Sequence, residues 1–235
     1  MKNLAIITAR GGSKRIPKKN IKNFFNKPII AYAIEACLSS NIFKEVMVST
    51  EDKEIAEISS KYMAKVPFMR SGKTSNDFTS TYDVLEEVVL EYKKLDKEFD
   101  NVCCVYPCVP FLTGKILKKA YDKFIRYKAN ALIPVVKFSY PIQRSLRIEN
   151  NILKYVYPEF EKSRSQDLEP MFHDVGMFYF IKTKTLLSEK TLVCKNSTYF
   201  KMKVTQIQDI DSIEDWEMAE LKYKIINKIK AKNDG

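Results

Sequence analysis

Residues 4–20 constrain the fold of this chain more than any other stretch, because a short apolar run passes directly into a basic, glycine-containing loop. Residues 4–7 form a run of the length expected for a buried strand. The glycines at positions 11 and 12 let backbone N–H groups turn toward an anion without obstruction by a Cβ. Five cations and no acidic residue follow or flank them: Arg10, Lys14, Arg15, Lys18 and Lys19. Since open α/β sheets bind ligands at the carboxyl ends of their strands, the loop predicts a triphosphate site, with a merely solvated basic loop as the alternative.

Two other phosphate-binding motifs are excluded. A Walker A loop has the pattern G-x-x-x-x-G-K-[ST], and here Pro67 stands at the position of its first glycine before Gly72-Lys73-Thr74. The six glycines of the chain also form no G-x-G-x-x-G dinucleotide fingerprint. The loop is therefore a phosphate site of another kind.

Strand-like and helical segments alternate along most of the chain. Apolar runs predict strands at residues 46–49, 66–69, 102–105, 131–136, 176–181 and 204–207. Helical spacing of apolar residues predicts helices starting at Pro28 and after Thr113, and over residues 52–62, 80–95 and 212–230. This order predicts an α/β fold with three layers and a mainly parallel, Rossmann-like sheet, in a single domain over residues 1–235.

The alternation breaks over residues 137–174. The Asn150-Asn151 pair predicts a β-hairpin turn, and a polar stretch follows it. The break is too long for a simple loop in a compact domain, so we expect a projecting hairpin arm. An apolar face of Ile152, Tyr155 and Tyr157 would need a partner surface, which a homodimer supplies most simply.

The net charge of +11 invites a nucleic-acid interpretation. Lysines are, however, dispersed and balanced by nearby acids, so we expect small anionic substrates and no nucleic acid. Five cysteines, an odd number, argue against a disulfide framework. The sequence shows neither a signal-peptide pattern nor an apolar run of the ~20 residues that span a bilayer, and we expect a cytoplasmic protein without a membrane partner.

The basic loop resembles the N-terminal signature of the acylneuraminate and KDO cytidylyltransferase family, which activates nonulosonic and related acidic sugars. In that family the segment is A-R-x-x-S-K-x-[IL]-P-x-K-N. Its fixed positions are filled here by Ala9, Arg10, Ser13, Lys14, Ile16, Pro17, Lys19 and Asn20. The resemblance runs from Leu4 to about Trp216. It implies a nucleotidyltransferase that uses CTP, Mg²⁺ and an acidic nine-carbon sugar, with an arm exchanged between two subunits.

Asp209 and Asp211 are the candidate metal ligands. They flank Ile210, so in an extended segment both carboxylates lie on one side, where they converge on one cation. The family has an I-D-I-D-x-x-x-D pattern at this place. The alternative is that Asp211 or Ser212 only caps the last helix.

The resemblance also implies the remaining nucleotide-site roles. We expect Arg10, Lys19 and Asp211 to be catalytic, with the cations on the phosphates. The predicted nucleotide-binding residues are Ala9, Arg10, Gly11, Gly12, Ser13, Lys14, Lys19, Asn20, Arg70, Thr79, Ser80 and Thr81. The alternative for Arg70 is that it is an ordinary surface arginine without a ligand. Ser80 could also cap a helix, because Asp83 follows it at the spacing of a capping box.

Departures from the sialic acid enzymes point to the pseudaminic acid branch of the family. Those enzymes have Q-P-T-S-P where this chain has Tyr106-Pro107, and an aromatic face in place of an amide suits a more deoxygenated sugar. Arg164 matches an R-x-Q element and is the candidate for the sugar carboxylate. The predicted substrate-binding residues are Tyr106, Pro107, Gln143, Arg144, Arg164, Gln166 and His173.

The resemblance thus implies transfer of CMP from CTP to pseudaminic acid with release of pyrophosphate, feeding glycan assembly such as flagellin glycosylation. The alternatives are a CMP-sialic, CMP-legionaminic or CMP-KDO synthetase. A non-catalytic nucleotide- or RNA-binding module is more remote.

Overall fold

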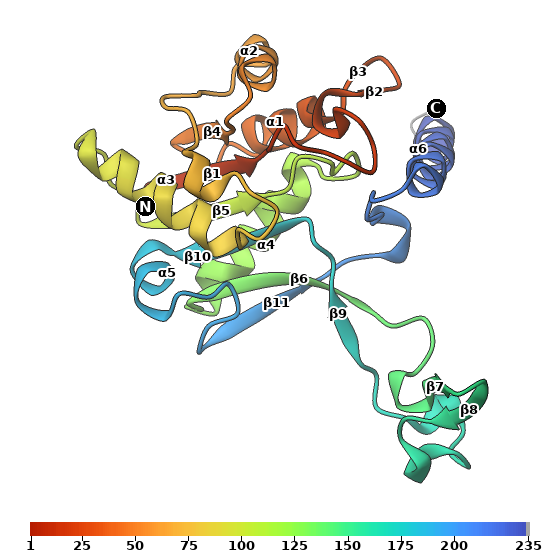
Figure 1. The fold of residues 1–235 in the computed structure, drawn as a ribbon. Helices are drawn as coiled ribbons and strands as arrows, with labels where there is room; N and C mark the ends of the chain where they lie inside the picture. Colours follow the sequence, from red (N-terminus) through yellow and green to blue (C-terminus); the bar gives the residue numbers. More distant parts are fainter. Residues whose placement is uncertain (234–235) are drawn as a thin grey trace.

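The fold is built on one twisted sheet. The computed structural model describes the backbone of residues 1–233 and the side chains of residues 1–228. The seven strands run in the order β11-β6-β10-β5-β1-β4, with β9 paired to β6 (Figure 1). Their bounds are β1 (Asn3–Thr8), β4 (Glu45–Ser49), β5 (Asn101–Val105), β6 (Ala131–Lys137), β9 (Phe172–Asp174), β10 (Phe178–Lys182) and β11 (Ser197–Lys201).

Most strands of the sheet run in one direction. β1 pairs in parallel with β4 and β5, and β11 pairs in parallel with β6. β10 lies antiparallel between β5 and β6, and β9 is antiparallel to β6. The predicted α/β fold with a mainly parallel sheet is confirmed, with two reversed strands that the sequence pattern did not distinguish.

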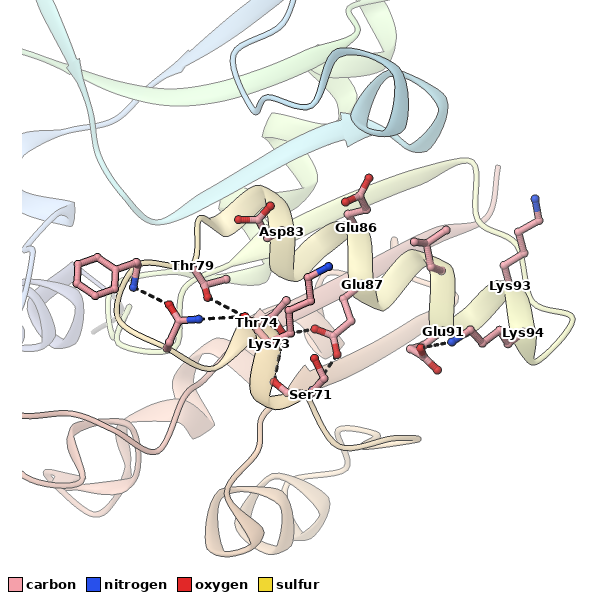
Figure 2. A pocket seen from close by; sticks show the side chains of 13 residues that line it. Ser71, Lys73, Thr74, Thr79, Asp83, Glu86, Glu87, Glu91, Lys93 and Lys94 are labelled. Carbon is pink, nitrogen blue, oxygen red and sulfur yellow. Dashed lines mark hydrogen bonds and ion pairs between the residues drawn. The ribbon is translucent and has the colours of Figure 1, made fainter.

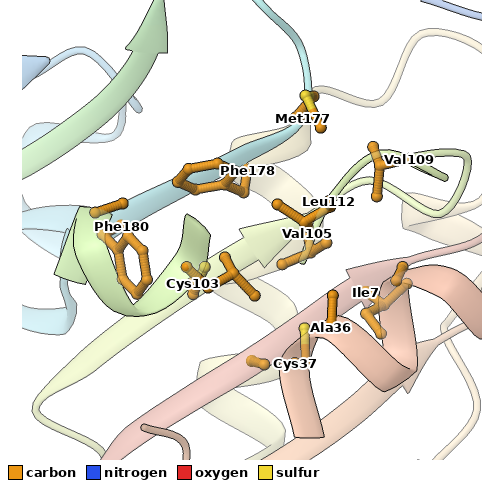
Figure 3. Close-up of a cluster of buried hydrophobic side chains, with 14 of the residues drawn as sticks. Ile7, Ala36, Cys37, Cys103, Val105, Val109, Leu112, Met177, Phe178 and Phe180 are labelled. Atoms are coloured by element: carbon orange, nitrogen blue, oxygen red, sulfur yellow. The ribbon is translucent and has the colours of Figure 1, made fainter. Parts of the chain in front are cut away.

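Helices cover both faces of the sheet and complete three layers. On one face lie α1 (Ile29–Ser39), α2 (Lys53–Lys61) and α4 (Gly114–Arg126), and on the other α3 (Thr81–Lys94) and α5 (Thr183–Glu189). The last helix, α6 (Ile213–Asn233), packs with Ile16 and Phe24 beside the basic loop. Alternate residues of β1 enter different cores: Ile7 packs with the α1 and α4 side, and Ile6 with the α3 and α5 side. Figure 3 shows the first core, in which Val105 and Cys103 lie between Phe178 on one side and Ile7 and Cys37 on the other. This alternation is what a strand buried on both faces requires.

Predicted helix starts are confirmed at three caps. The Asp52 carboxylate accepts hydrogen bonds from the backbone N–H groups of Glu54 (2.8 Å) and Ile55 (3.1 Å). Ser80 and Asp83 form a capping box on α3. Thr113 caps α4, whose first residue must be glycine because a Cβ on Gly114 would lie 2.6 Å from the Ser40 backbone nitrogen. Local side-chain chemistry therefore sets these boundaries.

Two predicted strands are wrong. Residues 66–69 form no strand; only an isolated bridge joins Met47 to Lys65, and Val66 and Phe68 pack on the cores without a ladder. Residues 204–207 contain a 3₁₀ turn, and the strand lies earlier, at β11. β11 is a partly exposed edge strand, so it lacks the continuous apolar run by which buried strands are recognised.

The shorter elements join these layers. β2 (Asn23–Phe24) pairs with β3 (Lys27–Pro28). Further 3₁₀ turns lie at Lys19–Ile21, Gly72–Thr74, Ile142–Arg144, Pro158–Phe160, Ser165–Asp167 and Val204–Gln206. No helix in the described part of the chain is both long and apolar enough to cross a membrane.

The predicted hairpin is present and projects away from the sheet (Figure 1). It consists of β7 (Leu146–Glu149) and β8 (Ile152–Tyr155). Asn150 and Asn151 both have positive φ, 50° and 63°, as a two-residue turn of type I′ requires.

The predicted apolar face of the hairpin needs correction. Because Leu146 pairs with Tyr155 and Ile148 pairs with Leu153, these four side chains share one face, whereas Ile152 pairs with Glu149 on the other. Ile148 and Leu153 are 73% and 63% exposed. The hairpin therefore presents an uncovered apolar face in the single chain.

Candidate active site

The basic loop, the end of β5 and the segment before α6 meet in one cavity. Its volume is about 380 Å³, and it lies at the carboxyl ends of the parallel strands, as predicted. The lining residues are Thr8, Arg10, Ser13, Lys19, Asn20, Arg70, Thr79, Ser80, Thr81, Val84, Tyr106, Pro107, Cys108, Gly176, Gln208, Asp209, Ile210 and Asp211. Segments nearly 200 residues apart in the chain thus form the site.

Lys19 connects the two ends of the chain across this cavity. Its ammonium donates to the Ile210 carbonyl at 2.5 Å and lies 3.3 Å from the Asp211 Oδ1. Arg15 contacts the same Asp211 oxygen at 2.9 Å. Two cations on one carboxylate fix the position of Asp211 relative to the basic loop.

Asp209 lies beside Asp211, as predicted from the spacing of the two residues. Burial, and next the charge of Asp211, raise the pKa of the Asp209 carboxyl. Two adjacent carboxylates are a donor set that suits Mg²⁺, which usually takes one or two carboxylates together with substrate phosphates. Among the described residues no group of three or more His, Cys, Asp or Glu side chains surrounds a cation position, so the remaining ligands would come from phosphate and water.

Ser212 and Asp215, rather than Asp211, cap the last helix. The Asp215 carboxylate accepts from the backbone N–H groups of Ser212 (2.8 Å) and Asp211 (3.1 Å), and the Ser212 hydroxyl accepts from the Asp215 N–H. This reciprocal pair is a capping box. The carboxylate of Asp211 is consequently free of a capping role and faces the cavity.

Arg10 and Lys14 are paired with an acidic residue that the sequence did not suggest. Both contact the Asp77 carboxylate, Lys14 at 2.6 Å. The hydrogen bond from Lys14, followed by that from Arg10, lowers the pKa of the Asp77 carboxyl. Asp77 therefore forms ion pairs with two of the cations that were predicted to bind phosphates. Its role cannot be found from local pattern, because the pairing joins loops 63 to 67 residues apart.

Gly11 and Gly12 of the basic loop differ in the space around them. The Gly11 N–H donates to the Glu51 Oε1 at 2.7 Å, and a Cβ on Gly11 would lie 2.6 Å from the Asp52 carboxylate. Gly12 has open space around its Cα. Within the described residues, Ala9, Gly11, Gly12 and Lys14 of the predicted nucleotide set adjoin the lining but do not form it.

Arg70 is buried rather than a surface residue. Its guanidinium donates to the Ser49 hydroxyl at 3.0 Å and to the Ser49 carbonyl at 2.6 Å. Burial lowers the pKa of Arg70, and the acidic side chains of Glu51 and Glu87 oppose that shift. A fixed positive charge thus stands at the back of the cavity.

Tyr106 forms the wall opposite the acidic segment, at the end of β5. Its hydroxyl lies 3.0 Å from the Thr81 Oγ1 at the start of α3. Pro107 and Cys108 continue the wall, and the Cys108 thiol donates to the Asn20 Oδ1 at 3.3 Å. The predicted residues Thr79, Ser80, Thr81, Tyr106 and Pro107 all line the cavity.

The predicted substrate residues of the arm lie apart from this cavity in the described chain. Gln143 is buried against the Glu169 carbonyl, and Arg144 reaches the Ser163 carbonyl. Arg164 pairs with Asp167 at 2.7 Å and is exposed. Gln166 lies in the adjoining 3₁₀ turn, and His173 is exposed in β9 and bonded to the Asp174 carbonyl.

Six lining residues were outside the predicted site set: Thr8, Val84, Cys108, Gly176, Gln208 and Ile210. Thr8 and Gln208 directly precede the predicted residues Ala9 and Asp209. Their position next to predicted site residues was the feature of the sequence that could have identified them. Gly176 has φ of 63°, which is a conformation that favours glycine.

A larger cavity, of about 830 Å³, lies on the outer side of α3. Figure 2 shows Glu87 tying Ser71 and Thr74 to this helix, with Asp83, Glu86 and Glu91 along the same side. Its lining carries the carboxylates of Asp83, Glu86, Glu87 and Glu91 against Lys73, Lys93 and Lys94, so it lacks the excess positive charge that a triphosphate requires, and it shares only Thr79 with the smaller cavity. The smaller cavity is the candidate active site.

Comparison with known proteins gives one consistent result. A family model described as cytidylyltransferase matches residues 4–215. The pseudaminic acid cytidylyltransferase of Campylobacter jejuni is 44% identical over 226 residues, covering 96% of this chain and 97% of that protein. The CMP-N,N'-diacetyllegionaminic acid synthase of Legionella pneumophila is 28% identical and covers 94% of this chain and 95% of its own length.

A solved structure of similar fold is a CMP-2-keto-3-deoxy-manno-octonic acid synthetase complexed with CTP. It has a TM-score of 0.70 at 17% identity and covers 97% of this chain and 100% of that chain. This likeness establishes the arrangement of the layers.

The Asp77 pairing makes a testable prediction. Asp77→Asn removes the carboxylate that competes for Arg10 and Lys14, so inorganic triphosphate should bind about threefold more tightly, the scale of an exposed ion pair. Isothermal titration calorimetry measures the affinity. Glu54→Gln, which removes the exposed partner of Lys18, is the matched control and should leave it unchanged. Unchanged or weaker binding by Asp77→Asn would show that Asp77 does not compete with the anion.

Proposed function

The chain belongs to the cytidylyltransferase family, and we propose that it transfers CMP from CTP to pseudaminic acid with release of pyrophosphate. The observation that carries the proposal is the meeting of Arg10, Lys19, Asp209 and Asp211 in one cavity bounded by Tyr106. Cations and carboxylates at one strand edge are what nucleotidyl transfer requires. The identity to the Campylobacter jejuni enzyme supports the choice of acceptor.

The transfer is an in-line displacement at the α-phosphate of CTP. A hydroxyl of the acceptor sugar loses its proton to solvent and forms the new P–O bond as the bond to the leaving pyrophosphate breaks. Negative charge then grows on the pyrophosphate, and Lys19 and Arg10 stabilise it. Lys19 is already held by Ile210 and Asp211, so little reorganisation is needed at the moment of transfer.

Asp209 and Asp211 would hold Mg²⁺. The ion would neutralise phosphate charge and orient the triphosphate. Burial, and next the charge of Asp211, raise the pKa of Asp209, and this supports the assignment, since a bound cation would stabilise both carboxylates in their charged form.

We place the reaction in the cytoplasm, where CTP is available and thiols stay reduced. All five cysteines are free in the structure, in keeping with that setting. The product would supply glycan assembly, with flagellin glycosylation as the outlet.

The acceptor is tested by pyrophosphate release from CTP with Mg²⁺ and a panel of pseudaminic, legionaminic, sialic and KDO acids. We expect the highest kcat/KM with pseudaminic acid. If another acid gives the highest kcat/KM, that acid is the acceptor, and the proposed transfer of CMP from CTP still holds. Absence of release with every acid, together with binding of RNA that weakens steeply with salt, would instead favour a non-catalytic binding module.

Asp211→Asn tests the acidic segment. Loss of the charge should lower kcat/KM at least ~100-fold, the usual scale for a preorganised charge at a transferring phosphate, and raise the Mg²⁺ concentration needed for half-maximal rate. Asp215→Asn is the matched control: it weakens the cap of α6, so it should lower the melting temperature more than the rate. Near wild-type rates and Mg²⁺ dependence in Asp211→Asn would remove Asp211 from the site.

We also propose a homodimer joined by the hairpin arm, in which the arm reaches the partner's cavity. The uncovered face of Leu146, Ile148, Leu153 and Tyr155 supports it, because exposed apolar surface of this kind is stabilised by a partner. None of the arm residues Gln143, Arg144 and Arg164 lines the cavity that Tyr106 bounds in the described chain, which also agrees with a site completed by a second subunit. Arg164 would then bind the sugar carboxylate in place of Asp167.

The two faces of the hairpin allow a matched test of the dimer. Ile148→Lys places a charge on the apolar face and should convert the dimer to monomer in sedimentation velocity. Ile152→Lys makes the same change on the opposite face, at a residue that is 59% exposed, and should leave the dimer intact. A wild-type protein that is an active monomer would contradict the proposal, as would equal effects of the two variants.

A further inference from the structure

Tyr106 is held in place from three sides. Its backbone N–H donates to the Met177 carbonyl at 2.9 Å. Its hydroxyl is hydrogen-bonded to Thr81 at 3.0 Å. Its ring meets the ring of Tyr179 edge to face, with 5.8 Å between centroids and 64° between planes.

A single carboxylate, that of Asp174, fixes the residues behind and beside Tyr106. Its Oδ2 accepts from the Tyr179 hydroxyl at 2.6 Å. Its Oδ1 accepts from the Gly176 N–H at 2.9 Å. Gly176 lines the cavity, and a Cβ built on it would lie 3.8 Å from the Tyr106 ring. Both oxygens of Asp174 are therefore engaged in shaping one wall of the site.

The protonation states suit this arrangement. Tyr179 is buried, and burial, followed by the neighbouring Tyr106 and Asp174, raises the pKa of its phenol. Burial also raises the pKa of Tyr106. Both rings consequently remain neutral, so Tyr179 stays a donor to the carboxylate over the range in which enzymes work.

We infer that Asp174 and Tyr179 are positioning residues that hold Tyr106 as the wall against which the acceptor sugar packs. This inference deepens the proposed function and rests on it. Asp174 is the last residue of β9, the strand that returns from the arm to the sheet. The same carboxylate thus links the seating of the arm to the shape of the acceptor site.

The effect of losing this link should fall on the acceptor rather than on CTP. The hydrogen bonds of Lys19 run to Ile210 and Asp211, and the Tyr106 hydroxyl keeps its own bond to Thr81 of the predicted nucleotide set when Tyr179 or Asp174 is changed. The buried pair of Tyr92 and Glu45 supplies a control, because its phenol also donates to a carboxylate, at 2.5 Å, about two helical turns along α3 from Val84, the last residue of that helix that lines the cavity.

Steady-state kinetics of Tyr179→Phe and Asp174→Ala with CTP and pseudaminic acid test the inference. Each variant should raise the acceptor KM about tenfold, the scale of one hydrogen bond to a charged group, and change the CTP KM less than about twofold. The double variant should raise the acceptor KM no more than Asp174→Ala alone does, since both substitutions remove the same Tyr179–Asp174 hydrogen bond. Tyr92→Phe should lower the melting temperature and leave both KM values unchanged.

The outcomes separate this inference from the proposed function. If the wild-type protein releases pyrophosphate and Tyr179→Phe keeps its acceptor KM, the inference alone is overturned. Equal losses for both substrates, accompanied by a lower melting temperature, would show that Asp174 and Tyr179 only stabilise the fold and would also overturn it. A wild-type protein inactive with every acid would overturn the proposed function, and the inference with it.

Discussion

The candidate active site depends on the contact of the Lys19 ammonium with the Ile210 carbonyl and the Asp211 carboxylate. A partly buried ammonium requires acceptors, and here they come from the opposite end of the chain. Apolar contacts reinforce the same closure, because Trp216 of α6 packs with Ile16 and Phe24 beside the basic loop. The cavity is therefore not a property of the sheet alone. It is complete only when the last helix is docked on the first loop.

Much of the fold follows from local pattern. Continuous apolar runs identify β1 and β5 because these strands are buried on both faces, and Ser80 and Thr113 mark helix starts because their side chains satisfy free backbone N–H groups. Local pattern fails at residues 66–69 and at β11. There the outcome depends on which neighbouring strand offers a free edge, and this is decided by tertiary structure.

The candidate site likewise contains some residues that could be predicted from the sequence and others that could not. The basic loop, Tyr106 and the Asp209 and Asp211 pair were predictable, because position at a strand end and the alternation of side chains bring such residues to one edge of the sheet. Asp77 was not, since its pairing with Arg10 and Lys14 is a long-range contact without a spacing signature. For the arm, sequence resemblance supplied Gln143, Arg144 and Arg164, whereas in one chain these residues face their own segment.

The pairing of Asp77 with the basic loop sets a threshold for anions. Whatever binds Arg10 and Lys14 must first displace a tethered carboxylate, so every anion loses the same factor in affinity at these residues. Occupancy then stays high only for an anion whose dissociation constant, after this loss, still lies below its concentration, which favours anions that make many further contacts, such as a triphosphate. The same exchange runs in reverse after turnover, when the returning carboxylate competes with the departing anion. In a chain of net charge +11, an internal counter-ion thus keeps the most basic loop from acting as a general anion trap.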